Sequence, residues 1–116
     1  MLKTFKDLLV WQKAHQLVLR IYKESNSFPV DERFGLTSQI RRASVSVAAN
    51  IAEGFRKRSK KEKIYFYSIS QTSLEEVRYY IILANDLDYW NQQELEYLLD
   101  EVGRMIDGLI KSLEKI

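Results

Sequence analysis

The sequence predicts an all-α protein, an up-down-up-down bundle of four helices. Apolar residues recur every three or four positions along most of the 116 residues, which is helical spacing. Four glycines and one proline leave little material for the many turns of a β fold. A chain of this length fits one core, so we expect residues 1–116 to form a single four-helix-bundle domain.

The first helix is expected to run from Phe5 to Ser25, and Pro29 excludes a longer one because the residue before a proline leaves the helical region. Phe28 is then expected to close that end of the core. The predicted inner face of this helix carries Leu8, Trp11, Ala14 or His15, Val18, and Ile21 or Tyr22.

The second helix is expected to begin as early as Asp31 and to end at Phe55 or Arg56, with Gly54 near its C-cap. Its predicted buried face carries Leu36, Ile40, Ala43, Val47, Ile51 and Gly54. A polar row at nearly whole-turn spacing borders this face, formed by Gln39, Ser46, Asn50 and Glu53. Buried polar groups are nearly always paired, so we expect the row to lie buried between helices or subunits; a ligand-binding or catalytic row is the alternative.

The third helix is expected to open with a capping box, in which Ser59 and Glu62 satisfy each other's backbone donors, and to stop near Asp88. Its predicted core face carries Phe66, Ile69, Ser73, Val77, Tyr80, Ala84 and Leu87, flanked by Leu74 and Ile81. Tyr89 and Trp90 then turn the chain.

A second capping-box pattern, residues 91–94, predicts the start of the fourth helix, which reaches almost to Ile116. Its apolar positions keep near-heptad spacing at Leu95, Leu98, Val102, Met105, Leu109 and Leu113. Gly103 and Gly108 lie inside this helix, where glycine is unfavourable. Either the helix is loosened there or a neighbour approaches closely.

Charge is distributed unevenly along the chain. Residues 33–63 carry nine Lys or Arg against two acids, a net charge of +7, whereas the rest carries nine bases against fourteen acids, a net charge of −5. A local basic field attracts polyanions even when the whole protein is nearly neutral. Nucleic acid is therefore the expected partner of the basic segment.

The candidate phosphate-binding residues are Arg41, Arg42, Arg56, Lys57, Arg58, Lys60, Lys61 and Lys63. Arg56 and Lys57 suit the negative pole at the end of the second helix. Lys60 and Lys61 fall in the first turn of the third helix, where the helix dipole disfavours cations, so an anion is expected there. A solvated charge run and an acidic protein partner are the alternatives.

Several chemistries are excluded by residue type. Without cysteine and with His15 as the one histidine, the chain has no disulfide and no zinc site of Cys and His ligands. Gln12 breaks the Glu-x-x-His pattern of diiron bundles, and no arginine precedes His15 as in helical RNases that pair the two. No catalytic residue, metal or cofactor is expected, and the hypothesis is a non-enzyme.

No apolar run approaches the length of a membrane span, and the first residues do not lead into a signal-peptide core. The absence of cysteine suits a reducing compartment. We therefore expect a cytoplasmic protein that does not associate with membranes.

Two motifs in the second helix support a family resemblance: residues 39–43, Gln-Ile-Arg-Arg-Ala, and residues 50–54, Asn-Ile-Ala-Glu-Gly. Together with residues 8–14, Phe28-Pro29 and residues 73–76, they resemble the four-helix-bundle proteins encoded in intervening sequences of 23S ribosomal RNA genes. The likeness covers nearly the whole chain. Asp88 departs from it, since glycine is common at this position in the family.

That family looks related to the accessory variability determinant of diversity-generating retroelements, a basic bundle that forms a pentameric barrel and works with a reverse transcriptase and nucleic acid. The resemblance implies a homopentamer with a nucleic-acid-associated role, and it carries over no catalytic residues.

The leading hypothesis is a bundle that binds structured RNA or an RNA–DNA hybrid through phosphate contacts. An adaptor that docks an acidic protein, such as a reverse transcriptase, and a hydrolase that uses the row from Gln39 to Glu53 are the alternatives.

Overall fold

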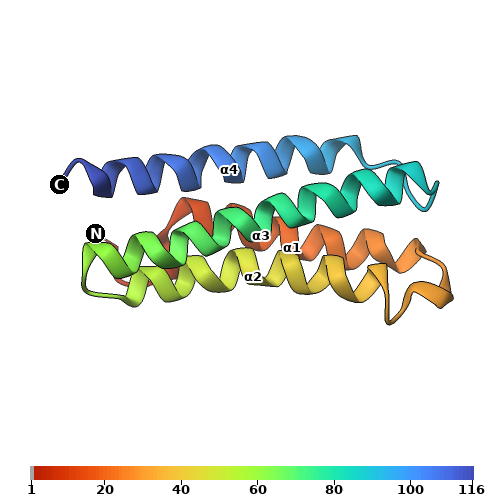
Figure 1. The fold of residues 1–116 in the computed structure, drawn as a ribbon, viewed down its shortest axis with the longest axis horizontal. Helices are drawn as coiled ribbons and strands as arrows, with labels where there is room; N and C mark the ends of the chain where they lie inside the picture. Colours follow the sequence, from red (N-terminus) through yellow and green to blue (C-terminus); the bar gives the residue numbers. More distant parts are fainter. Residues whose placement is uncertain (1) are drawn as a thin grey trace.

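The computed structural model describes residues 2–116, and in this range it contains four long α-helices and no strand (Figure 1). They are α1 (Leu9–Glu24), α2 (Leu36–Arg56), α3 (Lys60–Asp86) and α4 (Gln93–Glu114). Short 3-10 helices precede and follow α1: η1 (Phe5–Asp7), η2 (Ser25–Ser27) and η3 (Val30–Glu32). Consecutive α-helices run in opposite directions, which confirms the predicted four-helix bundle.

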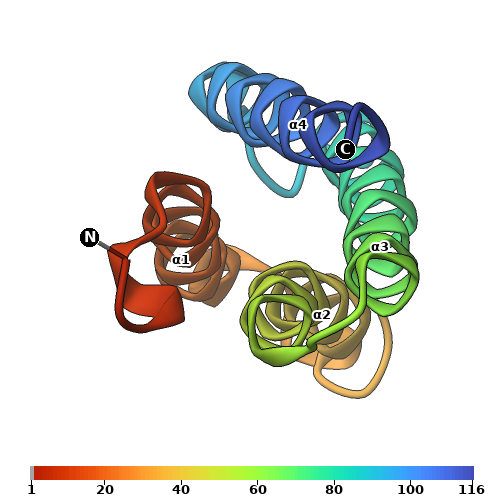
Figure 2. The ribbon, with the colours of Figure 1, turned by 90° about the vertical axis from the view of Figure 1, so that its left-hand side faces the viewer.

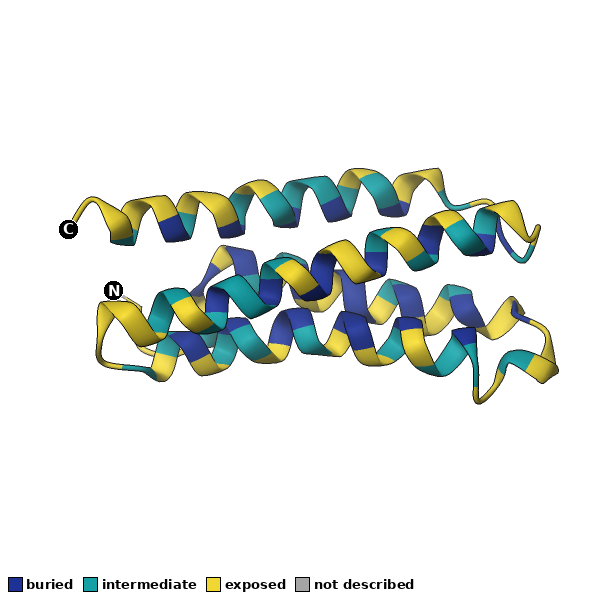
Figure 3. Ribbon diagram, in the orientation of Figure 1, coloured by how far each residue is buried: buried dark blue, intermediate teal, exposed yellow. Residues whose placement is uncertain are grey.

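The bundle measures 46 × 22 × 22 Å. Viewed along its length, α2 lies between α1 and α3, and α4 completes the arrangement beside α3 and α1 (Figure 2). Buried residues face inward on every helix (Figure 3). The centre of the core is formed by Leu17, Ile21, Ile40, Val47, Ile51, Val77, Ile81, Leu95, Leu99, Val102 and Ile106.

The first helix is shorter than expected, because the chain leaves the helical conformation at Leu8 (ψ 123°). Thr4 and Asp7 form a capping box that begins η1, and Leu8 then separates η1 from α1. The carboxylate of Asp7 accepts the N–H groups of Lys3 and Thr4, and these bonds lower its pKa. The apolar spacing that predicted a helix from Phe5 did not reveal this capping box.

The expected inner face of α1 is partly correct. Ala14, Val18 and Ile21 are buried, as is Leu8 just before the helix. Trp11 is half-buried, His15 and Tyr22 are exposed, and the buried residues Val10 and Leu17 were not expected.

Phe28 closes the end of the core as expected, with its ring edge-on to Trp90 at a centroid distance of 4.7 Å. The second helix begins at Leu36 rather than Asp31, because Glu32 caps it from outside. One Glu32 oxygen accepts the Leu36 N–H at 3.0 Å, and the other accepts the Tyr89 hydroxyl at 2.7 Å. A side chain expected within the first turn thus lies before the helix and ties it to the α3–α4 link.

Replacing Glu32 with glutamine is expected to destabilise the fold at pH 7 and to have a smaller effect as the pH falls below 4.5. The bonds from the Leu36 N–H and then from the Tyr89 hydroxyl lower the pKa of Glu32 below its ordinary 4.5. A depressed carboxyl pKa stabilises the protein above pH 4.5, and this contribution is lost as pH falls through the folded-state value. Thermal melts of both proteins across this range measure the effect.

Glu114→Gln is the matched control, since this exposed carboxylate makes no hydrogen bond or ion pair within residues 2–116. A constant difference in melting temperature between Glu32→Gln and the parent at pH 7 and pH 3 would contradict the proposed role of the charge.

Gly54 does not end α2, since the C-cap is Lys57. It is buried inside the helix against the ring of Tyr67 in α3. A Cβ atom at residue 54 would lie 2.5 Å from Cε1 and 2.8 Å from Cδ1 of that ring. Gly54 therefore permits a close approach of the two helices.

The α3 helix begins as predicted, with Ser59 Oγ accepting the Glu62 N–H at 3.1 Å. The reciprocal half of the box differs, because the Glu62 carboxylate accepts the Ser59 hydroxyl instead of a backbone N–H. The helix ends at Asp86, and Asp88 then adopts a left-handed backbone (φ 59°). This conformation favours glycine, because a residue with a Cβ atom is strained in it.

The predicted core face of α3 is rotated from the observed one. Phe66, Ile69 and Tyr80 are half-buried and Leu87 is exposed. The buried residues are Tyr67, Ser70, Ser73, Leu74, Val77, Ile81 and Ala84. Ser70 explains the rotation, because it is fully buried and its hydroxyl donates to the Val47 carbonyl at 2.7 Å. A periodicity of apolar residues does not register such a serine.

The second predicted capping box is wrong. The N-cap of α4 is Gln92, whose side chain makes no capping bond, and its N–H donates instead to the Asn85 side chain at 3.2 Å. The observed buried face is Leu95, Leu99, Val102, Ile106 and Ile110, while the expected Leu98, Met105, Leu109 and Leu113 are half-buried. Gly103 faces Leu74 closely, whereas Gly108 faces open space.

Candidate nucleic-acid interface

One end of the bundle gathers cations from two parts of the chain. It contains the α2–α3 turn and, beside it, the N-terminal segment with η1, which packs on α2 (Figure 1). We call this region the basic end and define its cations as Lys3, Lys6, Arg56, Lys57, Arg58, Lys60, Lys61 and Lys63. Lys3 and Lys6 were not among the predicted residues. The up-down topology itself places the start of the first helix beside the end of the second, so that topology was the missed signal.

Six of these cations are exposed and unpaired. The side chains of Lys3, Lys6, Arg56, Arg58, Lys60 and Lys61 make no hydrogen bond or ion pair with any described residue. The ion pairs of the described chain involve Lys13, Arg20 and Arg78 instead, and are distributed over the rest of the bundle. The positive field at this end is therefore directed toward solvent.

Lys57 and Lys63 differ from these six, because their ammonium groups contact other groups of the same chain. Lys57 Nζ lies 5.0 Å from the centre of the Phe66 ring. Lys63 Nζ donates to the carbonyls of Phe55 at 2.8 Å and Gly54 at 3.3 Å, at the C-terminus of α2. A cation at this pole stabilises the helix, so Lys63 has a structural use in addition to its charge.

Arg41 lies elsewhere and is fully engaged. Its guanidinium donates to Ser25 Oγ at 2.9 Å, to the Tyr22 carbonyl at 3.2 Å and to Asn26 Oδ1 at 3.1 Å. It also lies 4.8 Å from the centre of the Tyr22 ring. Arg41 thus caps the C-terminus of α1 and fastens α2 to it.

Arg42 is exposed and makes no hydrogen bond or ion pair within residues 2–116. It precedes Arg56 by fourteen residues, which places it about 21 Å from the α2–α3 turn along the helix. The predicted set of eight cations is therefore split between two places, with six at the basic end.

The predicted polar row does not form one buried line. At its centre Ser46 Oγ and Ser73 Oγ are 2.8 Å apart, and Asn50 Nδ2 donates to the Ser46 carbonyl at 2.8 Å and to its hydroxyl at 3.0 Å. The Ser46–Ser73 contact joins α2 to α3, whereas the two Asn50 bonds stay within α2. Gln39 and Glu53 are exposed, so the prediction that they are buried between helices of one copy is wrong. Their burial between subunits stays a prediction.

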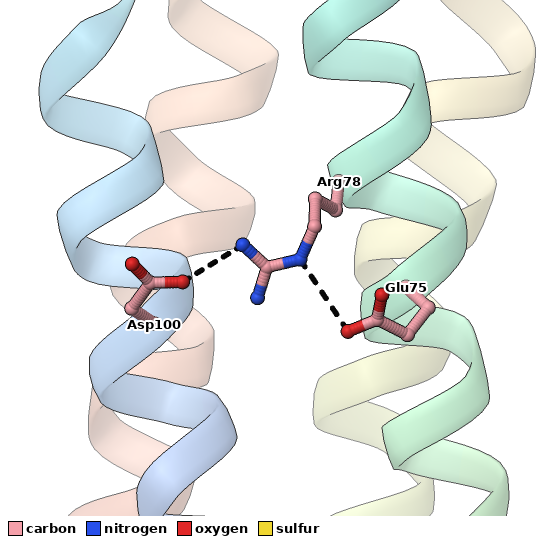
Figure 4. A network of polar contacts seen from close by, with 3 residues as sticks. All are labelled: Glu75, Arg78 and Asp100. Carbon is pink, nitrogen blue, oxygen red and sulfur yellow. Dashed lines mark hydrogen bonds and ion pairs between the residues drawn. The ribbon is translucent and has the colours of Figure 1, made fainter.

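A groove with a volume of about 420 Å³ lies between α3 and α4. Arg78 crosses it and donates to Asp100 at 2.8 Å and to Glu75 at 3.4 Å (Figure 4). Partial burial opposes the charge on Arg78, but these two carboxylates raise its pKa above the ordinary value. Because its acids and bases neutralise each other, this groove does not attract a polyanion.

Residues 2–116 contain neither a cluster of candidate metal ligands nor a membrane-spanning helix. No three or more His, Cys, Asp or Glu side chains are placed there to hold a metal ion. No helix in this range has the length and apolar character needed to cross a membrane. Every buried side-chain nitrogen or oxygen in the same range has a hydrogen-bond partner.

Comparisons with known proteins agree with the family resemblance. A family model described as 23S rRNA-intervening sequence protein matches residues 6–111. A solved structure from Bacteroides thetaiotaomicron, described as a protein with unknown function from the S23 ribosomal protein family, has a TM-score of 0.78 to this chain. The two are 22% identical over 89% of this chain and 96% of that one, a likeness that shows the fold. No curated protein matches.

Proposed function

The chain belongs to the family of 23S rRNA-intervening sequence proteins, and from this premise we propose that it is a non-enzymatic protein that binds nucleic acid through its basic end. One observation carries the proposal: Arg56, Arg58, Lys60 and Lys61 are exposed together and lack partners among residues 2–116. Cations that are not neutralised by their own protein are available to phosphates.

The mode of binding follows from the kind of side chain. Lysine and arginine side chains in the α2–α3 turn and in the first turn of α3 suit phosphate oxygens. The backbone N–H groups at the start of α3 can also donate to phosphate oxygens. Such contacts position a nucleic acid without reading bases. We therefore propose RNA, or an RNA–DNA hybrid, recognised by charge and shape, in the cytoplasm.

We further propose that the protein works as a ring of copies, five in number by the family resemblance. A cyclic ring whose axis follows the helices brings every basic end to the same face, because rotation about an axis does not reverse direction along it. Simultaneous contact by several copies raises the overall affinity well above that of one copy.

A titration measured by fluorescence anisotropy tests the binding proposal. Single-stranded RNA, an RNA–DNA hybrid and duplex DNA are each compared at about 50 to 300 mM salt, with polyglutamate as an acidic-protein mimic. Four phosphate contacts predict a slope near −3 for log affinity against log salt with single strands. The absence of binding to every nucleic acid at the lowest salt would refute the proposal, and tighter binding to polyglutamate would favour an adaptor for an acidic protein such as a reverse transcriptase.

A further inference from the structure

The middle of α2 carries no charge on any face. Residues 43–52, Ala-Ser-Val-Ser-Val-Ala-Ala-Asn-Ile-Ala, cover almost three turns without one ionisable side chain, in a chain that is 29% charged. A helix that is uncharged all round is normally buried all round. In a single copy, however, Val45 is 42% exposed and Ala49 is exposed too. This part of α2 therefore presents an uncharged face to solvent in a single copy.

An apolar groove follows this exposed face, between α1 and α2, with a volume of about 370 Å³. Small side chains of α2 form one side of it: Val45, Ala48, Ala49 and Ala52. The other side is larger and comes from the N-terminal part of the chain: Phe5, Trp11, His15 and Val18. The Trp11 and His15 rings stack at a centroid distance of 5.0 Å, which gives this side a flat, stiff wall.

A complementary ridge lies on the outer side of α3. Tyr65, Ile69, Thr72 and Tyr79 recur at helical spacing on the side opposite its buried residues. Tyr65 is 62% exposed. The Thr72 hydroxyl donates to the Ile69 carbonyl at 2.8 Å, so it is already satisfied within the helix. The ridge is bulky where the groove is lined by small residues.

Groove and ridge also match in height. The helices α2 and α3 run in opposite directions from the same turn, so a rise of about 1.5 Å per residue gives each position a height above that turn. In the groove, Ala52, Ala49 and Val45 lie at heights of about 6, 10 and 16 Å. In the ridge, Tyr65, Ile69 and Thr72 lie at heights of about 8, 14 and 18 Å.

A charge pair continues the same register. Arg42, one turn beyond Val45, lies at a height of about 21 Å, and Glu76, one turn beyond Thr72, lies at about 24 Å. Arg42 has no hydrogen bond or ion pair in the described chain, and Glu76 is exposed and uses one oxygen to accept the Tyr80 hydroxyl. Opposite charges therefore lie at the same end of the groove and of the ridge.

We propose that the α3 ridge of one copy packs into the α1–α2 groove of the next copy, with Arg42 of one copy paired to Glu76 of the other. The two surfaces differ, so the contact is head-to-tail, and a closed ring without axial shift brings residues of equal height together. The inference rests on the self-association proposed above and is independent of nucleic-acid binding.

Charge exchange tests this interface by light scattering and sedimentation. Arg42→Glu and Glu76→Arg each place like charges in contact, so each is expected to raise the dissociation constant more than about tenfold and shift the mass toward the 13.7 kDa monomer. The double variant, Arg42→Glu with Glu76→Arg, restores opposite charges and is expected to recover the assembly. Failure of this recovery would refute the Arg42–Glu76 pair.

Ala49→Glu is a second variant, which places a charge in the groove at an exposed position and is expected to give monomers with unchanged helix content by circular dichroism. Lys111→Glu, on an exposed site of α4, is the control and is expected to keep the parent mass. A parent protein that is monomeric at all concentrations refutes self-association itself. An oligomeric parent whose mass survives Ala49→Glu and both single charge reversals refutes this interface alone.

Discussion

Replacing Arg58, Lys60 and Lys61 with glutamine is expected to weaken RNA binding about 50-fold at 0.15 M salt. Each phosphate contact to a single strand contributes about 0.7 to the slope of log affinity against log salt, so three contacts account for about this factor at that concentration. The residues are exposed and make no side-chain bonds that stabilise the described chain, so the melting temperature should not change. Anisotropy titrations of both proteins measure the loss.

The matched control removes the same number of charges at the opposite end of the bundle. Arg20, Lys23 and Arg33 lie there, among acidic residues of the α1–α2 and α3–α4 links. Their replacement with glutamine lowers the net charge equally and is expected to change RNA affinity less than threefold. Equal losses in the two variants would show that net charge, rather than the basic end, attracts the nucleic acid.

The arrangement of this end was partly foreseeable from sequence. The run from Arg56 to Lys63 follows directly from the chain, and the capping by Ser59 fixed where α3 begins. Arg41 could not be assigned in the same way, since its partners Ser25 and Asn26 lie fifteen or more residues earlier. A basic residue within an α-helix gives no local sign that it will cap a different helix.

The fold class was predicted correctly because helical periodicity is a property of each segment by itself. The rotation of α3 and α4 about their own axes was not, because it depends on which side chains permit close approach. Ser70 is buried through one hydrogen bond to α2, and Gly54 makes room for Tyr67. These are contacts between helices, and an apolar repeat contains no information on them.

Gly54→Ala is expected to lower the free energy of unfolding by about 2 kcal/mol, and the melting temperature by about 8 °C. The added Cβ would lie 2.5 Å from the ring of Tyr67, which is 2% exposed and has little room to move. Overpacking of this kind costs about 1 to 3 kcal/mol, and the better helix propensity of alanine offsets part of that cost. Chemical and thermal unfolding of the variant measure the change.

The other two helical glycines provide an internal control series in α4. At Gly108 a Cβ meets nothing within 4 Å, so Gly108→Ala is expected to stabilise the fold by about 1 kcal/mol. At Gly103 it would lie 3.3 Å from Leu74 Cδ2, a flexible methyl group, so gain and cost should nearly cancel. The order of stability should be Gly108→Ala above Gly103→Ala above Gly54→Ala. If all three variants were stabilised alike, helix propensity alone would govern these positions, and close packing of α2 on Tyr67 would not be what requires glycine at residue 54.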